Sequence, residues 1–195
     1  MRVLFAGTPA VAVPSLDALV AAGFDVVAVL TRPDAPLGRK RVLTPSPVAA
    51  RAAELGIKII HAAKVDAAVT DQIGAAAPDV AAIVAYGGLI PRAALDIPRH
   101  GWINLHFSLL PAWRGAAPVQ RSLIAGDDVT GAVTFRREEG LDTGPVRGTL
   151  TEAVRPDDTA GALLDRLSQS GAVMLTQTLS AVDAGQAAAV PQQGE

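Results

Sequence analysis

Short apolar runs alternate with alanine-rich segments of helical periodicity along most of the chain. The apolar runs have the length of buried strands, and the segments between them carry apolar residues at helical spacing. Strands are predicted at residues 2–6, 26–30, 57–60, 80–85, 102–107, 130–137 and 145–151. Helices are predicted at residues 11–22, 48–55, 66–76 and 116–125. A last helix, with Asp157 or Asp158 as its N-cap, is predicted to end at Gly185.

This alternation of strands and helices predicts an α/β fold, in which helices cover a mostly parallel sheet. Residues 1–185 are expected to form one domain. Residues 186–195 are small, polar or proline, and no predicted element is left to partner them. They are therefore interpreted as the start of a linker or as a tail.

The connection at residues 31–47 is longer than the roughly 2–6 residues of a usual loop between a strand and a helix. It contains four prolines and the basic run Arg39-Lys40-Arg41. A solvated charge run is the simplest interpretation. Contact with phosphates is the alternative, because ligands of such sheets bind beyond the carboxyl ends of the strands, where this loop is expected.

Composition limits the classes of protein that fit. Half of the 195 residues are hydrophobic and 18% are charged, which allows a sizeable core. The net charge of −2 argues against a protein that coats nucleic acid, although a local basic patch is compatible with it. Cysteine is absent, which excludes disulfides, thiolate nucleophiles and zinc–thiolate sites. No apolar run approaches the roughly 20 residues that span a bilayer, and residues 1–6 resemble a strand rather than a signal peptide, so we expect a cytoplasmic protein.

Three residues stand out as candidates for catalysis. Asn104, the only asparagine of the chain, precedes His106 by two residues, so both side chains project from the same face of a strand. Asp142 lies in the turn Gly140-Leu-Asp-Thr-Gly144, whose glycines let the backbone come close to a ligand. A carboxamide can stabilise an oxyanion, an imidazole can move a proton, and a carboxylate can fix the tautomer of that imidazole. Together they are the groups that acyl transfer requires.

A structural interpretation of the same three residues stays open on spacing alone. Asn104 could satisfy a strand end, His106 could cap a sheet edge, and Asp142 could form an Asx turn. Elsewhere, Gly7-Thr8-Pro9 follows a strand but lacks any glycine-rich phosphate-binding pattern, so no dinucleotide cofactor is expected. His61 and His100 are interpreted as structural or solvated, and scattered histidines without cysteine predict no metal site.

Six segments together resemble the amino-terminal catalytic domain of the methionyl-tRNA formyltransferases, and the resemblance covers essentially all of residues 1–195. Two of them, Ile103-Asn-Leu-His-Phe-Ser-Leu-Leu-Pro111 and Gly140-Leu-Asp-Thr-Gly144, carry motifs shared with other formyltransferases that use 10-formyltetrahydrofolate. These motifs are Asn104-Leu-His106, Ser108-Leu-Leu-Pro111 and Asp142-Thr-Gly144. The other four are Phe5-Ala-Gly-Thr-Pro9 with Val13-Pro-Ser-Leu16, Arg32-Pro-Asp-Ala-Pro-Leu-Gly-Arg39 with Leu43-Thr-Pro-Ser-Pro-Val48, Val84-Ala-Tyr-Gly-Gly-Leu-Ile-Pro91 and Arg114-Gly-Ala-Ala-Pro-Val-Gln-Arg121. The Gly7-Thr-Pro9 start, the Ser46-Pro-Val48 loop and Arg114-Gly-Ala-Ala-Pro118 are typical of the methionyl-tRNA formyltransferases in particular.

The resemblance implies a Rossmann-like formyltransferase fold, with a mostly parallel sheet and helices on both faces. It implies transfer of a formyl group from 10-formyltetrahydrofolate to the α-amine of methionyl initiator tRNA, without a metal and with the chain as a monomer. The implied catalytic residues are Asn104, His106 and Asp142. The implied folate-binding residues are Ser108, Leu109, Leu110 and Pro111. The implied tRNA-binding residues are Arg39, Lys40 and Arg41.

Two features depart from the family's pattern. The β-rich carboxyl-terminal domain that normally follows is absent from this sequence, and Arg136, Arg137 and Arg147 stand where less charged residues are expected. Two other functions are therefore weighed. One is a related folate-dependent formyltransferase that acts on a small amine such as glycinamide ribonucleotide, which would not need the Ser-Pro-Val loop. The other is an inactive module that binds folate or tRNA.

Overall fold

The computed structural model describes residues 1–194 and shows two compact units, Met1–Trp102 and Ile103–Glu195. Both contain strands packed against helices, which confirms the predicted α/β class. The first unit contains three parallel strand pairings and one antiparallel pairing, and the second unit contains two antiparallel pairings. Among the described residues, no helix combines the length and the apolar character that crossing a membrane requires.

The first unit is built on four parallel strands in the order β5-β2-β1-β6. These strands are β1 (Arg2–Gly7), β2 (Asp25–Thr31), β5 (Ile59–His61) and β6 (Val80–Val84). All of β6 and nearly all of β1 are buried, as expected for strands covered on both faces. The continuously apolar runs of the sequence therefore become the strands that are buried on both faces.

Helices of the first unit pack on both faces of these strands. The helical elements are η1 (Ala10–Ala12), α1 (Val13–Ala21), α2 (Pro47–Glu54), α3 (Ala67–Ala76) and α4 (Arg92–Leu95). Leu4 and Ala6 of β1 share a core cluster with residues of α3 and α4, such as Ile73. The alternate residue Phe5 is equally buried but lies outside that cluster, because neighbouring residues of a strand face opposite sides.

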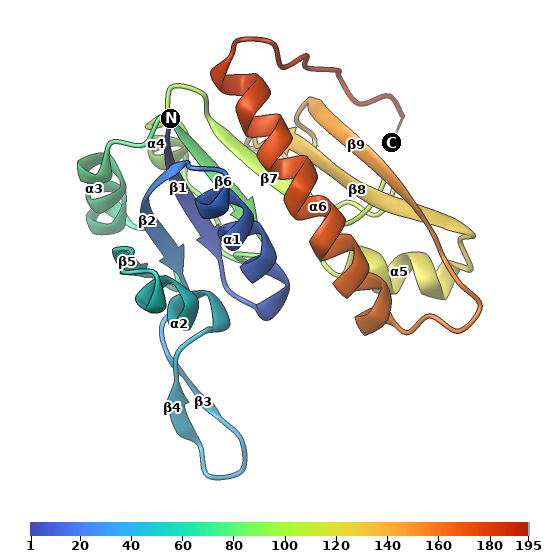
Figure 1. The fold of residues 1–195 in the computed structure, drawn as a ribbon, viewed down its shortest axis with the longest axis horizontal. Helices are drawn as coiled ribbons and strands as arrows, with labels where there is room; N and C mark the ends of the chain where they lie inside the picture. Colours follow the sequence, from blue (N-terminus) through green and yellow to red (C-terminus); the bar gives the residue numbers. More distant parts are fainter. Residues whose placement is uncertain (195) are drawn as a thin grey trace. The chain divides into compact units, whose positions relative to one another are not determined.

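The long connection at residues 31–47 contains a β-hairpin that the sequence did not predict. Strands β3 (Ala35–Leu37) and β4 (Val42–Thr44) pair antiparallel across a turn at residues 38–41. The hairpin projects from the rest of the first unit, and most of its residues are exposed (Figure 1). Because it buries little apolar surface, the alternating hydrophobic pattern that marks most strands is missing from its sequence.

The second unit contains an antiparallel ladder in the order β7-β8-β9. Its elements are β7 (Trp102–His106), α5 (Pro118–Ala125), β8 (Val129–Arg136), β9 (Val146–Ala153) and α6 (Ala160–Asp183). Helix α6 lies across β8 and β9 (Figure 1). Gly171 of α6 approaches Leu105 of β7 so closely that an added Cβ would lie 3.0 Å from the leucine side chain. Leu105 therefore faces α6, whereas Asn104 and His106 face the other side of β7.

Most predicted elements are confirmed to within one or two residues at their ends, but three details of the prediction are wrong. The N-cap of α6 is Thr159, whose side chain accepts a hydrogen bond from the Ala162 N–H, because Asp158 is instead paired with Arg166. The short helix α4 was not predicted. The expectation that residues 186–195 have no partner is also wrong, since Val190 pairs with Val146 at the start of β9.

Candidate active site

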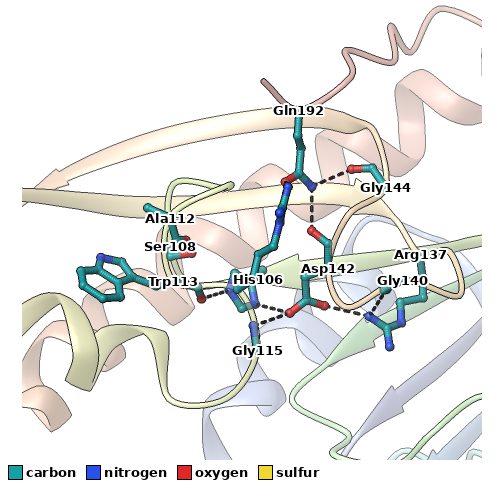
Figure 2. Close-up of polar contacts among 11 residues, drawn as sticks. His106, Ser108, Ala112, Trp113, Gly115, Arg137, Gly140, Asp142, Gly144 and Gln192 are labelled. Atoms are coloured by element: carbon teal, nitrogen blue, oxygen red, sulfur yellow. Dashed lines mark hydrogen bonds and ion pairs between the residues drawn. The ribbon is translucent and has the colours of Figure 1, made fainter. Parts of the chain in front are cut away.

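His106 is the last residue of β7, and its imidazole is buried, with 7% of the residue exposed. The ring stands edge-on to that of Phe135 on β8, with ring centroids 6.4 Å apart. Its Nε2 atom lies 3.0 Å from the carbonyl oxygen of Trp113 (Figure 2). A carbonyl can only accept, so Nε2 carries the donated proton, and Nδ1 of the neutral ring is left as an acceptor.

Asp142 lies in the turn between β8 and β9, with a positive φ of 53°. Its Oδ2 accepts a hydrogen bond from the Gly115 N–H at 2.8 Å, and its Oδ1 accepts one from Arg137 at 2.9 Å (Figure 2). The same Oδ2 is 3.9 Å from Nδ1 of His106, too far for a direct hydrogen bond. The turn thus places a negative charge beside the one ring nitrogen that is free to take a proton.

Burial is the main cause that lowers the pKa of His106 below its usual value, because the charged imidazolium is poorly solvated there. The Trp113 carbonyl and the Asp142 carboxylate act in the opposite direction, and the charge of Arg137 lowers the pKa further. The net result is a neutral ring at neutral pH. A neutral ring with a free Nδ1 is a competent proton acceptor.

Asn104 lies on the same face of β7 as His106, because the two residues are two positions apart in the strand. It is directly opposite Phe135 on β8, and His106 is opposite Val133. Asn104 is half-buried, and within residues 1–194 its carboxamide has no hydrogen-bond partner. The carboxamide N–H groups of Asn104 therefore form no hydrogen bond within the described part of the fold and lie on the same strand as the His106 ring. They are available to donate to a substrate oxygen.

The structure divides the predicted folate-binding stretch into two parts. Ser108 is fully buried, and its hydroxyl donates to the carbonyl of Ala112 at 2.7 Å, so it closes the turn after β7 (Figure 2). Leu109 packs over Gly131 of β8. Leu110 and Pro111 line a hollow of about 470 Å³, whose other walls are the start of β9 and residues 188–193.

Arg39, Lys40 and Arg41 lie in the turn of the β3–β4 hairpin, in the first unit. All three are exposed, and none forms an ion pair within the described residues. Their charges are therefore available to a partner. Within the same residues there is no group of three or more His, Cys, Asp or Glu side chains that could hold a metal ion.

Several residues around His106 were not predicted as part of the site. The Trp113 carbonyl and the Gly115 N–H are backbone groups, which a sequence does not reveal through residue type. Arg137 stood out in the sequence only as an unexpected charge, and its partner proves to be Asp142. Gln192, from the segment interpreted as a tail, donates to the carbonyls of Asp142 and Gly144.

Comparison with known proteins defines the class of this chain. The formyl transferase family matches residues 1–179, and the chain belongs to that family. The chain is 84% identical over 195 residues to the methionyl-tRNA formyltransferase of Arthrobacter sp. (strain FB24), a match that covers 100% of this chain and 64% of that protein. It is 61% identical over 193 residues to the enzyme of the same name from Salinispora tropica, with 98% and 63% covered. The chain thus spans a little under two thirds of the length of these relatives.

Solved structures with the same fold carry more distant sequences. Glycinamide ribonucleotide transformylase 1 from Symbiobacterium toebii has a TM-score of 0.80 at 19% identity, with 95% of this chain and 88% of that chain covered. An N-formyltransferase from Helicobacter canadensis, in complex with folinic acid and dTDP-3-aminofucose, has a TM-score of 0.78 at 18% identity, with 100% and 68% covered. The expected formyltransferase fold is confirmed.

Proposed function

We propose that this chain transfers a formyl group from 10-formyltetrahydrofolate to the α-amine of methionyl initiator tRNA. The observation that carries the proposal is the 3.9 Å approach of the His106 Nδ1 to the Asp142 carboxylate, in a chain 84% identical to a methionyl-tRNA formyltransferase. The reaction takes place in the cytoplasm, the chain acts as a monomer, and the catalytic domain comprises at least residues 1–185.

His106 moves the proton in the proposed reaction. The amine nitrogen attacks the formyl carbon, the bond from that carbon to N10 of the folate breaks, and tetrahydrofolate leaves. The proton that the amine loses passes to Nδ1 of His106 and then to the departing N10. Because Trp113 already holds the proton on Nε2, protonation of Nδ1 creates an imidazolium 3.9 Å from the Asp142 carboxylate, which stabilises it.

Asn104 stabilises the negative oxygen that forms when the amine adds to the formyl carbon. Its carboxamide, which the fold leaves without a partner, donates a hydrogen bond to that oxygen. Removal of one such donor typically costs on the order of 10²–10³ in rate. No metal ion or covalent intermediate is part of the proposal.

The substrates are bound by different segments. Leu109, Leu110 and Pro111 contribute apolar surface to the folate, while Ser108 holds their turn through its bond to Ala112. The exposed charges of Arg39, Lys40 and Arg41 attract the phosphates of tRNA. The identity to relatives named for methionyl-tRNA favours this acceptor over a small amine.

The test is transfer of labelled formyl from 10-formyltetrahydrofolate, with methionyl initiator tRNA and glycinamide ribonucleotide offered separately and then together. We expect formylation of the tRNA and none of the ribonucleotide. Formylation of the small amine alone would replace the proposal with that of a small-amine formyltransferase. Binding of folate or tRNA with transfer to neither acceptor would leave an inactive binding module.

A further inference from the structure

Gln192 makes four hydrogen bonds with its side chain, more than any polar residue of the proposed catalytic set. Its amide nitrogen donates to the carbonyl oxygens of Asp142 at 2.7 Å and Gly144 at 2.8 Å. Its amide oxygen accepts from Nε and Nη2 of Arg114, at 3.2 and 2.8 Å. The side chain thus joins two separate loops (Figure 2).

These two loops supply the groups that surround His106. Arg114 lies between Trp113, whose carbonyl accepts from Nε2 of His106, and Gly115, whose N–H donates to Asp142. The other loop carries the Asp142 carboxylate itself, 3.9 Å from Nδ1. A change in the spacing of these loops would therefore alter both sides of the imidazole.

The segment that carries Gln192 is itself attached to the second unit. Val190 and Val146 exchange backbone hydrogen bonds of 2.8 Å in both directions, and Arg147 donates to the Ala187 carbonyl at 3.1 Å. These residues lie beyond the family match, which ends at residue 179. The contacts to the site are thus made by a segment that the family pattern does not include.

We propose that Gln192 is a positioning residue of the formyl-transfer site, which fixes the 112–117 loop and the 137–145 turn around His106. The proposal rests on the proposed function. A primary amide suits this place because it donates twice and accepts twice at once. A glutamate could still accept from Arg114, but it would turn an acceptor toward the two carbonyl oxygens.

The variants are Gln192→Ala and Gln192→Glu, with Gln186→Ala as the matched control. Gln186 lies in the same carboxyl-terminal segment but outside the hollow, is exposed, and its side chain makes no hydrogen bond within the described residues. Misplacement of catalytic groups by about 1 Å costs on the order of 10²-fold in rate, so kcat should fall by about 10- to 100-fold in both Gln192 variants. The KM for the formyl donor should change little, and Gln186→Ala should match the wild type.

A second readout separates positioning from general stability. The chain has three histidines, so the ring signals of His106 can be followed by NMR as a function of pH. In Gln192→Ala the turn opens and His106 is better solvated, so its pKa should rise toward the ordinary value, whereas in Gln186→Ala it should stay as in the wild type.

The outcomes distinguish this inference from the proposed function. An active wild type whose Gln192 variants keep kcat and the His106 titration would overturn the role of Gln192 and leave the function intact. A wild type without formyl transfer would overturn the function. The NMR titration would then decide alone, because an unchanged His106 pKa in Gln192→Ala would overturn the positioning role as well.

Discussion

The carboxylate of Asp142 lies 3.9 Å from Nδ1 of His106, yet its two hydrogen bonds go to Gly115 and Arg137. The histidine in turn uses Nε2 to bind the Trp113 carbonyl at 3.0 Å. Neither group is therefore held by the other. The partners of Asp142 fix its carboxylate at a distance from which it can stabilise an imidazolium once Nδ1 gains a proton. At this distance the carboxylate does not keep a proton on Nδ1 while the ring is neutral.

This arrangement differs from a triad in which the carboxylate accepts the N–H of the histidine. Here the backbone carbonyl of Trp113 sets the tautomer, and the carboxylate acts through its charge. The pKa of His106 is lowered mainly by burial, so the ring is neutral at neutral pH, as the proposed proton transfer requires. The following predictions test the separate parts of this arrangement.

Asn104→Ala should lower kcat by roughly 10²–10³, because it removes one donor to the developing oxyanion. Its effect on stability should be small, since the carboxamide has no hydrogen-bond partner within residues 1–194 and is only half-buried. Steady-state formyl transfer together with thermal unfolding measures both. A variant that keeps its kcat, or that loses activity only because it unfolds, would exclude Asn104 from oxyanion stabilisation.

Arg137→Ala should move the acid limb of the kcat profile to higher pH. The charge of Arg137 lowers the pKa of His106, so its removal raises that pKa, and the ring becomes protonated and inactive at a higher pH than in the wild type. The variant should also lose about 1–3 kcal/mol of stability, because Asp142 is left with one hydrogen bond fewer. The matched control is Arg136→Ala, an exposed arginine next to it in sequence. An identical acid limb in both variants would contradict the role of Arg137.

Replacement of Arg39, Lys40 and Arg41 by alanine should raise KM for methionyl-tRNA much more than KM for the formyl donor. The loss of up to three phosphate contacts should also reduce the slope of log KM against log salt by about two to three units. A matched control removes three other exposed cations, Lys58, Lys64 and Arg121. Equal effects of the two triple variants, or equal effects on both substrates, would make the hairpin turn a purely structural element.

The unfolding free energy should contain a pH-dependent contribution from His106. The folded pKa lies below the value of 6.5 for an unperturbed ring, so the unfolded chain binds more protons in the window between the two. This contribution to stability is present above pH 6.5 and is lost as pH falls through that window. Urea unfolding of the wild type and His106→Asn across this range measures it. A stability difference between the two proteins that does not depend on pH would contradict the lowered pKa.

The sequence predicted those parts of the fold that depend on burial. Apolar runs such as residues 80–85 became fully buried strands because both of their faces are covered, and the stripe with Leu163, Leu167 and Leu175 became the buried face of α6. The β3–β4 hairpin escaped prediction because it is exposed and proline-rich. The short helix α4 offers too few residues for a periodic pattern to be recognised.

The candidate site also contains groups that the sequence predicted and groups that it could not reveal. Asn104 and His106 could be placed on one face of a strand from their spacing, and Asp142 could be placed in a glycine-bounded turn. The Trp113 carbonyl and the Gly115 N–H could not be foreseen, because any residue type provides such groups. The contacts of Gln192 could not be predicted for another reason. Its hydrogen-bond partners are 48 to 78 residues away in the sequence, and only the fold brings them together.

The role of His106 can be measured by formyl transfer to methionyl-tRNA in a single turnover, with both substrates saturating, for the wild type and for His106→Asn. Asparagine keeps a polar group at this buried position but cannot accept a proton at neutral pH. We predict that the variant binds the formyl donor and remains folded, while the rate of transfer falls by about 10²–10⁴. Transfer within a few fold of the wild type would contradict the central role of His106 as the proton acceptor.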